Sequence, residues 1–536
     1  MAASKNDRVN LDALIQRQDL EVVSPDGNNT AGKDTPIPVS ELAIGKLHYQ
    51  LLRKPGFQRE TDDWSIDNVV TLIKSFANGH LIPALIVWRG GTGYTFVIDG
   101  AHRLSALIAW VNDDFGAGEI SKAYFKGQLP KKQREIHDEC KARVEKEVGA
   151  YLTLSRVLML PERPTPDQVR TASNLSGALV TQTVGGDAEM AATSFLAINQ
   201  RAVQIDPTER YMIEHRDKPN VIAARALVKN ARGHEYWRKF NIDVRHRIEQ
   251  RARQIYSAIY EPEDAEAHSD VELQPAGLAY TANGLRIAVD LVNIVNGVKS
   301  PPEKNDMTGE ATDRFIDKTN GVVKFIAGHD PSSMSLHPSV YFWNATGNHQ
   351  PSMFLAVVAF VQDLIHRDEL IAFTLVRASF EEFLLGKGEI RKHILGKYGG
   401  WGKSLGPTGR MLRTLFNGLS HGKSFDAIEA LILKDQGGDD GSDIELVTKK
   451  DNWKETKKAL RRQAALDLAL RCPICKARMV IAHMSDDHTR RRSDGGSSNV
   501  DNAKLTHHFC NHGFKEHYSQ RGLPLPDIVE PVLAPH

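Results

Sequence analysis

Four side chains that commonly bind metal ions lie close together near the C-terminus of this 536-residue chain. Cys472 and Cys475 form a C-x-x-C pair, and His507 and Cys510 form an H-x-x-C pair downstream. Three thiolates and one imidazole suit a closed tetrahedral zinc site, and zinc bound there contributes directly to the free energy of folding. The spacing therefore predicts a structural zinc site. These two pairs alone would fit equally well a zinc ribbon with only a structural or binding role and no catalytic activity.

A second group of polar residues lies within and just after the loop that the zinc would close. Its members are Asp487, His488, Gly495, Gly496, Asn502 and Asn511. Carboxylate and amide oxygens suit a magnesium or manganese ion, which can neutralise charge on a phosphate group. A neutral imidazole can accept a proton from water near pH 7. This group predicts metal-dependent hydrolysis of a phosphodiester bond.

The two groups together resemble the HNH nucleases, which have a ββα-metal fold. The resemblance implies that His488 is the general base that activates water. It also implies that Asp487 and Asn511 hold a catalytic Mg²⁺ or Mn²⁺, and that Asn502 shapes the loop that carries the histidine. The last position of the motif is Asn511 rather than a histidine, a variant that the family uses. We therefore expect residues 449–520 to form a zinc-stabilised ββα-metal HNH domain.

The expected nuclease region is basic, although the whole chain has a formal net charge of only +1. Residues 449–521 contain 16 Lys and Arg against 8 Asp and Glu. This excess predicts a surface that faces nucleic-acid phosphates, with a merely solvated surface as the alternative. The residues expected to contact DNA are Lys457, Lys458, Arg461, Arg462, Arg490, Arg491 and Lys515.

A second informative region lies near the N-terminus. Apolar spacing predicts a helix over residues 66–79, and two β-rich runs, PALIVWRG and YTFVIDG, follow it. The sequence DGAHRL (residues 99–104) then opens an apolar helix. This strand–turn–helix pattern places backbone N–H groups, His102 and Arg103 at a helix N-terminus, which is a favourable place for a phosphate group. The alternative is a structural turn, with Asp99 capping the helix and Arg103 paired on the surface.

This region resembles the ParB-like fold, and within it the DGQQR/DGQHR branch of GmrSD-type restriction and phage-defence proteins. The resemblance implies a site that binds or hydrolyses a nucleoside triphosphate. Ala101 stands where the family usually has Gln, which favours binding over hydrolysis. Asn199 belongs to an F-x-x-I-N segment that completes the family's domain, and a helix C-cap is its alternative role. The residues implied to line the nucleotide site are Gln58, Arg59, Asp99, Gly100, His102, Arg103 and Asn199.

The chain is long enough for several domains, and we expect an α+β multidomain protein. Apolar residues recur at helical spacing over much of the middle of the chain. The small, polar run over residues 171–186 predicts a loop. The expected order is a flexible arm over 1–40, a ParB-like α/β domain over 41–206, a mostly α-helical domain over 207–436, a linker over 437–448, the HNH domain over 449–520 and an extended tail over 521–536.

Cysteine content and hydropathy indicate the cellular setting. The zinc site uses three of the four cysteines, which leaves Cys140 as a spectator and fits a reducing cytoplasm. The apolar run that begins at Met353 is too short to span a bilayer, so we expect no membrane association.

The sequence therefore predicts a nucleotide-regulated HNH DNA endonuclease of anti-phage defence that senses modified DNA and has a possible second activity as an NTPase. One alternative is a free-standing homing or toxin-type HNH nuclease without nucleotide turnover. Another is a non-catalytic, zinc-containing ParB-like DNA-binding regulator. Metal-dependent cleavage of DNA separates the last alternative from the other two. The sequence leaves open whether the chain forms a homo-oligomer or acts with partner proteins of a defence system.

Overall fold

The computed structural model shows a mixed α+β protein, as the sequence predicts. It divides into two compact units, residues 1–216 with 232–234, and residues 217–231 with 235–536. None of the described helices is both long and apolar enough to cross a bilayer. The structure describes residues 8–18, 20, 34–56, 58, 61, 64–89, 93–125, 127, 129, 131–159, 163–202, 207–232, 235–260, 273–277, 282–436 and 453–528. The linker expected over residues 437–448 lies outside them.

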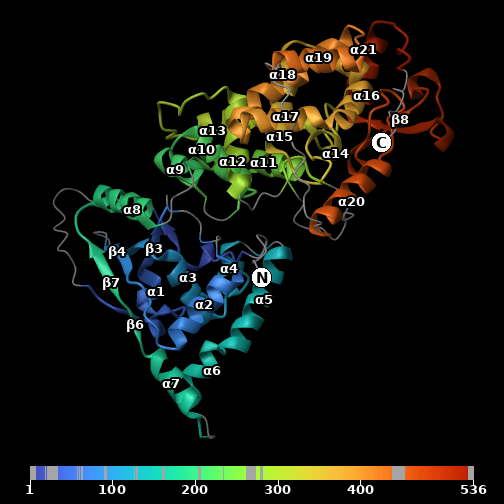
Figure 1. Cartoon of the computed structure of the whole chain (residues 1–536). Helices are drawn as coiled ribbons and strands as arrows, with labels where there is room; N and C mark the ends of the chain where they lie inside the picture. The colour runs from blue at the N-terminus through green and yellow to red at the C-terminus, as the bar shows by residue number, and fades with distance from the viewer. Residues whose placement is uncertain are drawn as a thin grey trace. The chain divides into compact units, whose positions relative to one another are not determined.

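The first unit is built on a five-stranded sheet with the order β1-β3-β5-β4-β7. Figure 1 labels β3, β4 and β7 of this sheet. Strands β4 and β5 are antiparallel, as expected for the two β-rich runs, and the other neighbouring pairs are parallel. A separate antiparallel pair joins β2 (Ile37–Pro38) to β6 (Ala178–Leu179). The strands of the main sheet are β1 (Arg17–Gln18), β3 (Leu52–Pro55), β4 (Leu85–Arg89), β5 (Thr95–Asp99) and β7 (Thr181–Val184).

Helices cover both faces of this sheet. Alternation along β5 shows why, because Val97 packs into the core formed with α2 and α3, whereas Phe96 and Ile98 pack with α8 on the opposite face. The helices of the unit are α1 (Leu47–Leu51), α2 (Ile66–Ala77), α3 (Ala101–Asn112), α4 (Glu119–Tyr124), α5 (Lys131–Glu147), α6 (Tyr151–Ser155), α7 (Pro166–Leu175), α8 (Ala188–Ala202) and α9 (Pro207–Glu214).

Residues 8–18 differ from the loose arm that we expected, because they form part of the core. Val9, Leu11 and Leu14 are fully buried. The carboxylate of Asp12 accepts hydrogen bonds from Lys54 Nζ at 2.6 Å and Arg17 Nη2 at 2.7 Å. Burial alone would raise the pKa of Asp12, but these two cations hold that pKa well below its usual range. The N-terminal segment is thus fixed by a buried ion pair as well as by apolar contacts.

The polar run over residues 171–186, expected to be a loop, instead contains the end of α7 and the strands β6 and β7. Strand β7 (Thr181–Val184) lies at one edge of the main sheet and pairs with β4. Its polar composition suits an edge strand, because one side of such a strand lacks a partner in the sheet.

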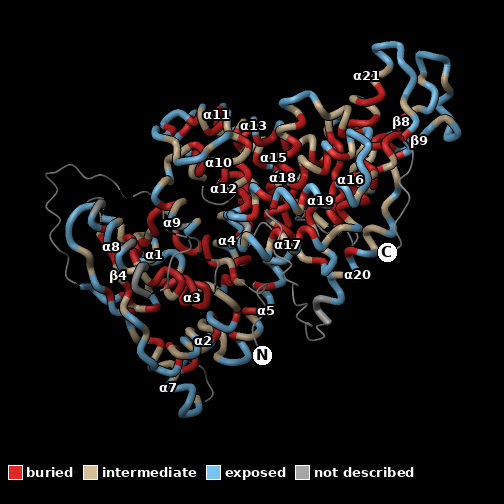
Figure 2. Tube along the Cα trace, turned by 45° about the horizontal axis from the view of Figure 1, so that its top comes forward, coloured by how far each residue is buried: buried red, intermediate tan, exposed pale blue. Residues whose placement is uncertain are grey.

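The second unit is a helical assembly followed by the Cys–His region. Figure 2 shows buried residues running through α10, α12, α15 and α18. Helix α15 contains the apolar run from Met353 and is buried along much of its length, which is why that run is so apolar. The helices of the second unit that precede the Cys–His region are α10 (Pro219–Val228), α11 (Ile242–Ile259), α12 (Ala282–Asn296), α13 (Glu310–Ile326), α14 (Pro338–Tyr341), α15 (Pro351–His366), α16 (Leu370–Gly386), α17 (Gly388–Tyr398), α18 (Trp401–Ser420), α19 (Phe425–Asp435) and α20 (Trp453–Asp467).

The Cys–His region follows α20 within the same unit. It contains an antiparallel hairpin of β8 (Met484–His488) and β9 (Ala503–His507). A short π-helix, Cys510–Phe514, leads directly into α21 (Lys515–Gln520). The order strand, strand, helix is the one expected from the sequence, although this region shares one compact unit with the helical assembly rather than forming a unit of its own.

Candidate metal centre and hydrolytic site

Two loops bring the four expected zinc ligands together. The candidate ligand atoms of Cys472, Cys475, His507 and Cys510 all lie within 4.8 Å of one another, and all four residues are buried. The first loop is closed by a hydrogen bond from the Lys476 N–H to the Cys472 carbonyl at 2.8 Å. Lys476 adopts a left-handed conformation with φ of 61°, which turns the chain back so that both sulfurs face the same point.

The orientation of His507 also fits a metal ligand. Its Nδ1 lies 3.3 Å from the sulfur of Cys475 and 3.7 Å from that of Cys510. Its Nε2 lies 3.0 Å from the carbonyl oxygen of Arg478. A histidine that binds a metal through one nitrogen usually donates the other N–H to a carbonyl or carboxylate, which fixes the ring. Nδ1 is therefore the nitrogen that faces the cluster.

The chemistry of the cluster calls for a cation. Burial and the neighbouring Cys472 raise the pKa of the Cys475 thiol, and hydrogen bonds with Cys472 and Cys475 raise that of Cys510. Three thiolates cannot share this buried volume without a positive charge between them. A zinc ion supplies that charge, so the residues fit a structural zinc site, as the sequence predicts.

The hairpin connects this cluster to Asp487 and His488, which lie toward the end of β8 opposite the pairing of Met484 with His507. Asp487 is buried, whereas its neighbour Asp486 is exposed, as expected for alternating positions of a strand. His488 is partly exposed and ends β8, where it pairs with Ala503. Among the described residues, no side chain hydrogen-bonds to its imidazole, which leaves the ring nitrogens available for water.

Asn502 ties down the loop that follows His488. Its side-chain oxygen accepts a hydrogen bond from the Arg490 N–H at 2.7 Å, and its amide nitrogen donates to the Arg490 carbonyl at 2.8 Å and the Ser497 carbonyl at 2.7 Å. Gly496 lies in the same loop, where a Cβ atom would come within 2.0 Å of the Arg490 carbonyl oxygen. Only glycine therefore fits at that position.

Two oxygen atoms near the end of β8 suit a divalent cation. Oδ2 of Asp487 is buried and has no hydrogen-bond partner among the residues that the structure describes. The amide nitrogen of Asn511 donates to Ser485 Oγ and to the Asp486 carbonyl, both at 3.1 Å, which leaves its side-chain oxygen as the available ligand atom. Lys504 Nζ lies 3.8 Å from Oδ2 of Asp487, beyond hydrogen-bond distance, and the carboxylate and amide oxygens are of the types that bind Mg²⁺ or Mn²⁺.

Lys515 does not fit the DNA-contacting role that the sequence suggested. The residue is buried, and its Nζ lies 2.5 Å from Asp487 Oδ1 and 2.6 Å from the His488 carbonyl oxygen. One helical turn separates Lys515 from Asn511, which brings both side chains to the same end of β8. Lys515 is thus an internal counter-ion of the candidate site.

Arg462 likewise does not fit the DNA-contacting role that the sequence suggested. Its side chain is buried in α20 and donates to the Ser339 carbonyl at 2.9 Å. Burial lowers the pKa of Arg462 to about 10, with the nearby charge of Arg478 adding to the effect. Of the other candidates, Lys458 bonds to Asn348 and Arg491 pairs with Glu516. Lys457, Arg461 and Arg490 are exposed.

The expected nucleotide turn in the first unit joins β5 to α3. Gly100 has φ of 92°, and a Cβ atom there would come within 2.5 Å of the Leu85 side chain, so the turn requires glycine. Arg103 Nη2 lies 2.9 Å from Asp99 Oδ2 and 3.2 Å from the Ala84 carbonyl. The pairing of Arg103 with Asp99 matches one part of the structural alternative, but Asp99 does not cap α3, because the N-cap is Gly100 and no side chain bonds there. Both paired side chains remain partly exposed.

The remaining nucleotide candidates are placed as follows. The amide of Gln58 donates to the Ile98 carbonyl at 3.3 Å, and its buried side-chain oxygen has no hydrogen-bond partner. His102 is buried and stacks on Trp64 with ring centroids 5.7 Å apart. Asn199 lies within α8, but its side chain is not described. Arg59 lies outside the described residues.

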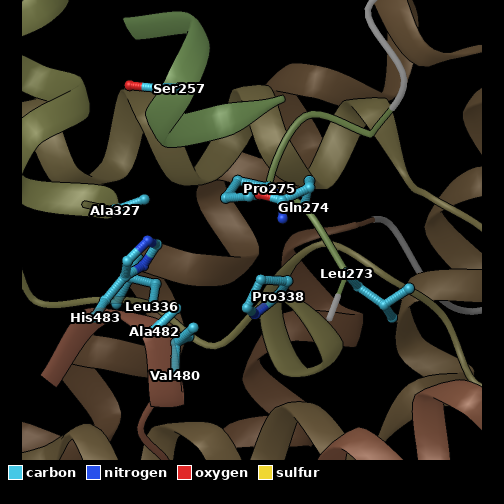
Figure 3. A pocket seen from close by; sticks show the side chains of 10 residues that line it. All are labelled: Ser257, Leu273, Gln274, Pro275, Ala327, Leu336, Pro338, Val480, Ala482 and His483. Atoms are coloured by element: carbon cyan, nitrogen blue, oxygen red, sulfur yellow. The ribbon is translucent and has the colours of Figure 1, made fainter. Parts of the chain in front are cut away.

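A small pocket lies in the second unit where the Cys–His region meets the helices (Figure 3). Val480, Ala482 and His483 line one side, and residues such as Ser257 of α11 and Pro338 of α14 line the others. Its volume of about 50 Å³ holds only a few water molecules, so this pocket does not accommodate a nucleotide.

Sequence reasoning missed three charged residues of α16, of which two contact the Cys–His region directly and the third bonds to one of them. Arg377, Glu381 and Glu382 are all buried. One signal for them exists in the sequence, because they interrupt an otherwise apolar helix at spacings of four and five residues. Charged groups are rarely buried without partners, so charges in such a helix indicate an internal ion network.

Comparison with known proteins gives one match. Residues 40–213 match the family model described as GmrSD restriction endonuclease, N-terminal domain. No curated protein and no solved structure matches the chain. The matched segment contains β4, β5 and the Asp99–Arg103 turn, on which the resemblance to that family was based. The match therefore supports a place for this part of the chain in the GmrSD-type restriction endonuclease family.

Proposed function

We propose that the chain is a metal-dependent DNA endonuclease of the HNH type, acting in restriction of phage or modified DNA. The observation that carries this proposal is the position of the hairpin on the Cys–His cluster. His507 pairs with Met484 at one end of the hairpin and belongs to the cluster, while His488 lies at the other end beside Asp487. The cluster would therefore keep β8, the strand that carries the reactive residues, in a fixed position.

Each residue of the site has a distinct task in the proposed reaction. His488 accepts a proton from the attacking water, because its imidazole is partly exposed and no side chain in the described part of the chain hydrogen-bonds to it. Asn502 fixes the loop that follows it. Asp487 and Asn511 would hold a Mg²⁺ or Mn²⁺ ion, which neutralises charge on the scissile phosphate when bound. Exposed Lys457, Arg461 and Arg490 supply contacts to the DNA backbone.

Replacement of the proposed base tests this function. We expect His488→Ala to reduce cleavage of DNA by about two to four orders of magnitude, the usual contribution of a general base. Zinc content, measured by elemental analysis, should not change, because His488 is not a ligand of the cluster. His512→Ala is the matched control, since His512 is an exposed histidine of the same region and should retain activity. Wild-type cleavage by His488→Ala would refute the assignment.

The ion pair between Lys515 and Asp487 favours one alternative function. It neutralises the carboxylate without a metal ion, as would suit a zinc-containing DNA-binding regulator that has lost catalysis. A cleavage assay with Mg²⁺ or Mn²⁺ and both modified and unmodified DNA distinguishes the two. DNA binding without cleavage of any substrate supports the regulator.

We also propose that a nucleoside triphosphate regulates the enzyme through the turn between β5 and α3. Support comes from the helix N-terminus at Gly100 and from the partly exposed Arg103, which can exchange Asp99 for a phosphate group. Nucleotide can change cleavage only if it binds one state of the protein better than another. NTPase activity is a further possibility that turnover assays would test.

Replacement of Arg103 tests the proposed regulation. We expect Arg103→Ala to remove the dependence of cleavage on nucleotide, measured as the ratio of rates with and without each nucleoside triphosphate. The partly exposed ion pair with Asp99 contributes about 1 kcal/mol or less, so the variant should fold. If wild-type cleavage does not respond to any nucleotide, and Arg103→Ala behaves as wild type, the turn is structural.

A further inference from the structure

The C-x-x-C loop is held at both ends by one residue of α16. Arg471 and Arg478 flank the loop and form an isolated antiparallel bridge with each other. Both guanidinium groups bind Glu382, with Arg471 Nη2 at 2.9 Å and Arg478 Nη1 at 2.7 Å from Oε1. Burial alone would raise the pKa of Glu382, but these two arginines lower it. The two ends of the metal-binding loop are therefore joined through a carboxylate of the helical assembly.

A second carboxylate of α16 connects to the histidine ligand. Oε2 of Glu381 accepts a hydrogen bond from the Arg478 N–H at 2.9 Å. The carbonyl of Arg478 lies 3.0 Å from Nε2 of His507. A single residue thus separates Glu381 from the imidazole that faces the cluster. Because Glu381 is fully buried, this connection is shielded from water.

Arg377 completes the network one helical turn before Glu381. Its guanidinium donates to Glu381 Oε1 at 3.0 Å and to the Met334 carbonyl at 2.6 Å, and it is almost fully buried. Burial alone would lower the pKa of Arg377, but the charge of Glu381 raises it. Arg377 therefore holds Glu381 in the position from which its other oxygen reaches the Arg478 N–H.

The second ligand pair is also held by the helical assembly. The N–H of Phe509, between His507 and Cys510, donates to the Ser333 carbonyl at 2.8 Å. Nearby, Ser335 Oγ donates to the His483 carbonyl at 3.2 Å. Both serines belong to the segment that follows α13. Each half of the cluster is thus fixed by main-chain or side-chain groups from outside the Cys–His region.

We infer that α16 supplies the outer shell of the zinc centre, with Arg377, Glu381 and Glu382 acting as positioning residues for its ligands. The inference rests on the proposed zinc site and extends it to residues about 90 positions away in the chain. Residues that orient metal ligands typically change metal affinity by about 10–100-fold when they are replaced. The helical assembly therefore belongs to the metal centre rather than only connecting it to the first unit.

Zinc affinity of the full-length chain tests this inference. We expect the double variant Glu381→Gln/Glu382→Gln to bind zinc about 10–100-fold more weakly than wild type in competition with a colorimetric chelator. Glu369→Gln is the matched control, because Glu369 pairs with Arg413 at the other end of α16 and should change zinc affinity by less than about twofold. Unchanged zinc affinity in the folded double variant would overturn the inference.

A milder variant covers the case in which the double variant does not fold. Arg471 is only partly buried, so Arg471→Gln should retain native circular dichroism while releasing one end of the loop. We expect it to release zinc to the chelator about tenfold faster than wild type and Glu369→Gln. Equal release rates in all three proteins would contradict the role of Glu382. A wild-type chain without zinc would instead refute the zinc site itself.

Discussion

The candidate hydrolytic site contains a residue whose type suggested one role and whose surroundings give it another. Lys515 belongs to a basic region and was expected to contact DNA. In the structure its ammonium group is buried against Asp487 and the His488 carbonyl. A second cation, Lys504 Nζ, lies 3.8 Å from the other carboxylate oxygen. Two lysine ammonium groups thus lie against the carboxylate of Asp487 without a divalent ion.

This arrangement predicts how a divalent ion compensates for the loss of Lys515. We expect Lys515→Met to lower the free energy of unfolding by about 3–5 kcal/mol without divalent ions, because one partner of a buried ion pair remains uncompensated. Added Mn²⁺ should stabilise Lys515→Met more than wild type, because the ion supplies the missing charge to Asp487. Chemical unfolding with and without Mn²⁺ measures both effects.

The control uses an ion pair of the same region that is more exposed. Arg491→Met removes the contact with Glu516 and should cost about 1 kcal/mol or less, with the same response to Mn²⁺ as wild type. If Lys515→Met unfolds like wild type, Lys515 is not the counter-ion of Asp487. If Mn²⁺ stabilises the variant and wild type equally, the ion does not bind at this carboxylate.

At the scale of elements, the sequence predicts helices, strands and ligand pairs well where local spacing determines the structure. The C-x-x-C and H-x-x-C pairs predicted the cluster of four ligands, because each pair needs only one tight turn. The two β-rich runs predicted β4 and β5, and apolar spacing predicted α2. Each of these signals lies within about 12 consecutive residues, and local propensity and burial agree there.

The sequence predicts side-chain contacts poorly where the two partners are distant in the chain. Arg462 looked like one of several cations of a basic helix. In the structure it is buried, and the carbonyl of Ser339 in α14 accepts its hydrogen bond. Glu382 and Arg478 are 96 residues apart, and nothing in the spacing of either segment indicates their pairing. Residues 8–18 were expected to be part of a loose, polar arm, and the pairing of the distant Lys54 with Asp12 is a contact that this segment alone does not show. Such contacts depend on tertiary packing, which one sequence does not show.

At the scale of the whole molecule, the division into two compact units indicates which residues the metal centre stabilises. The Cys–His region shares its unit with the helical assembly, whereas the Asp99–Arg103 turn lies in the other unit. The contacts of Glu381, Glu382 and Ser333 join the metal centre to helices of its own unit. Loss of zinc should therefore affect the second unit and not the first.

Removal of zinc with a chelator tests this division by hydrogen–deuterium exchange. In the metal-free chain we expect faster exchange in residues 471–520, and also in α16 and residues 332–335, because their hydrogen bonds to the cluster region are lost. Exchange in β4, β5 and α3 should remain as in the zinc-bound chain, because these elements belong to the other compact unit. Zinc added back should restore protection. Faster exchange confined to 471–520 would show instead that the Cys–His region folds independently of α16, and altered exchange in β4 or β5 would show that the first unit depends on the metal centre.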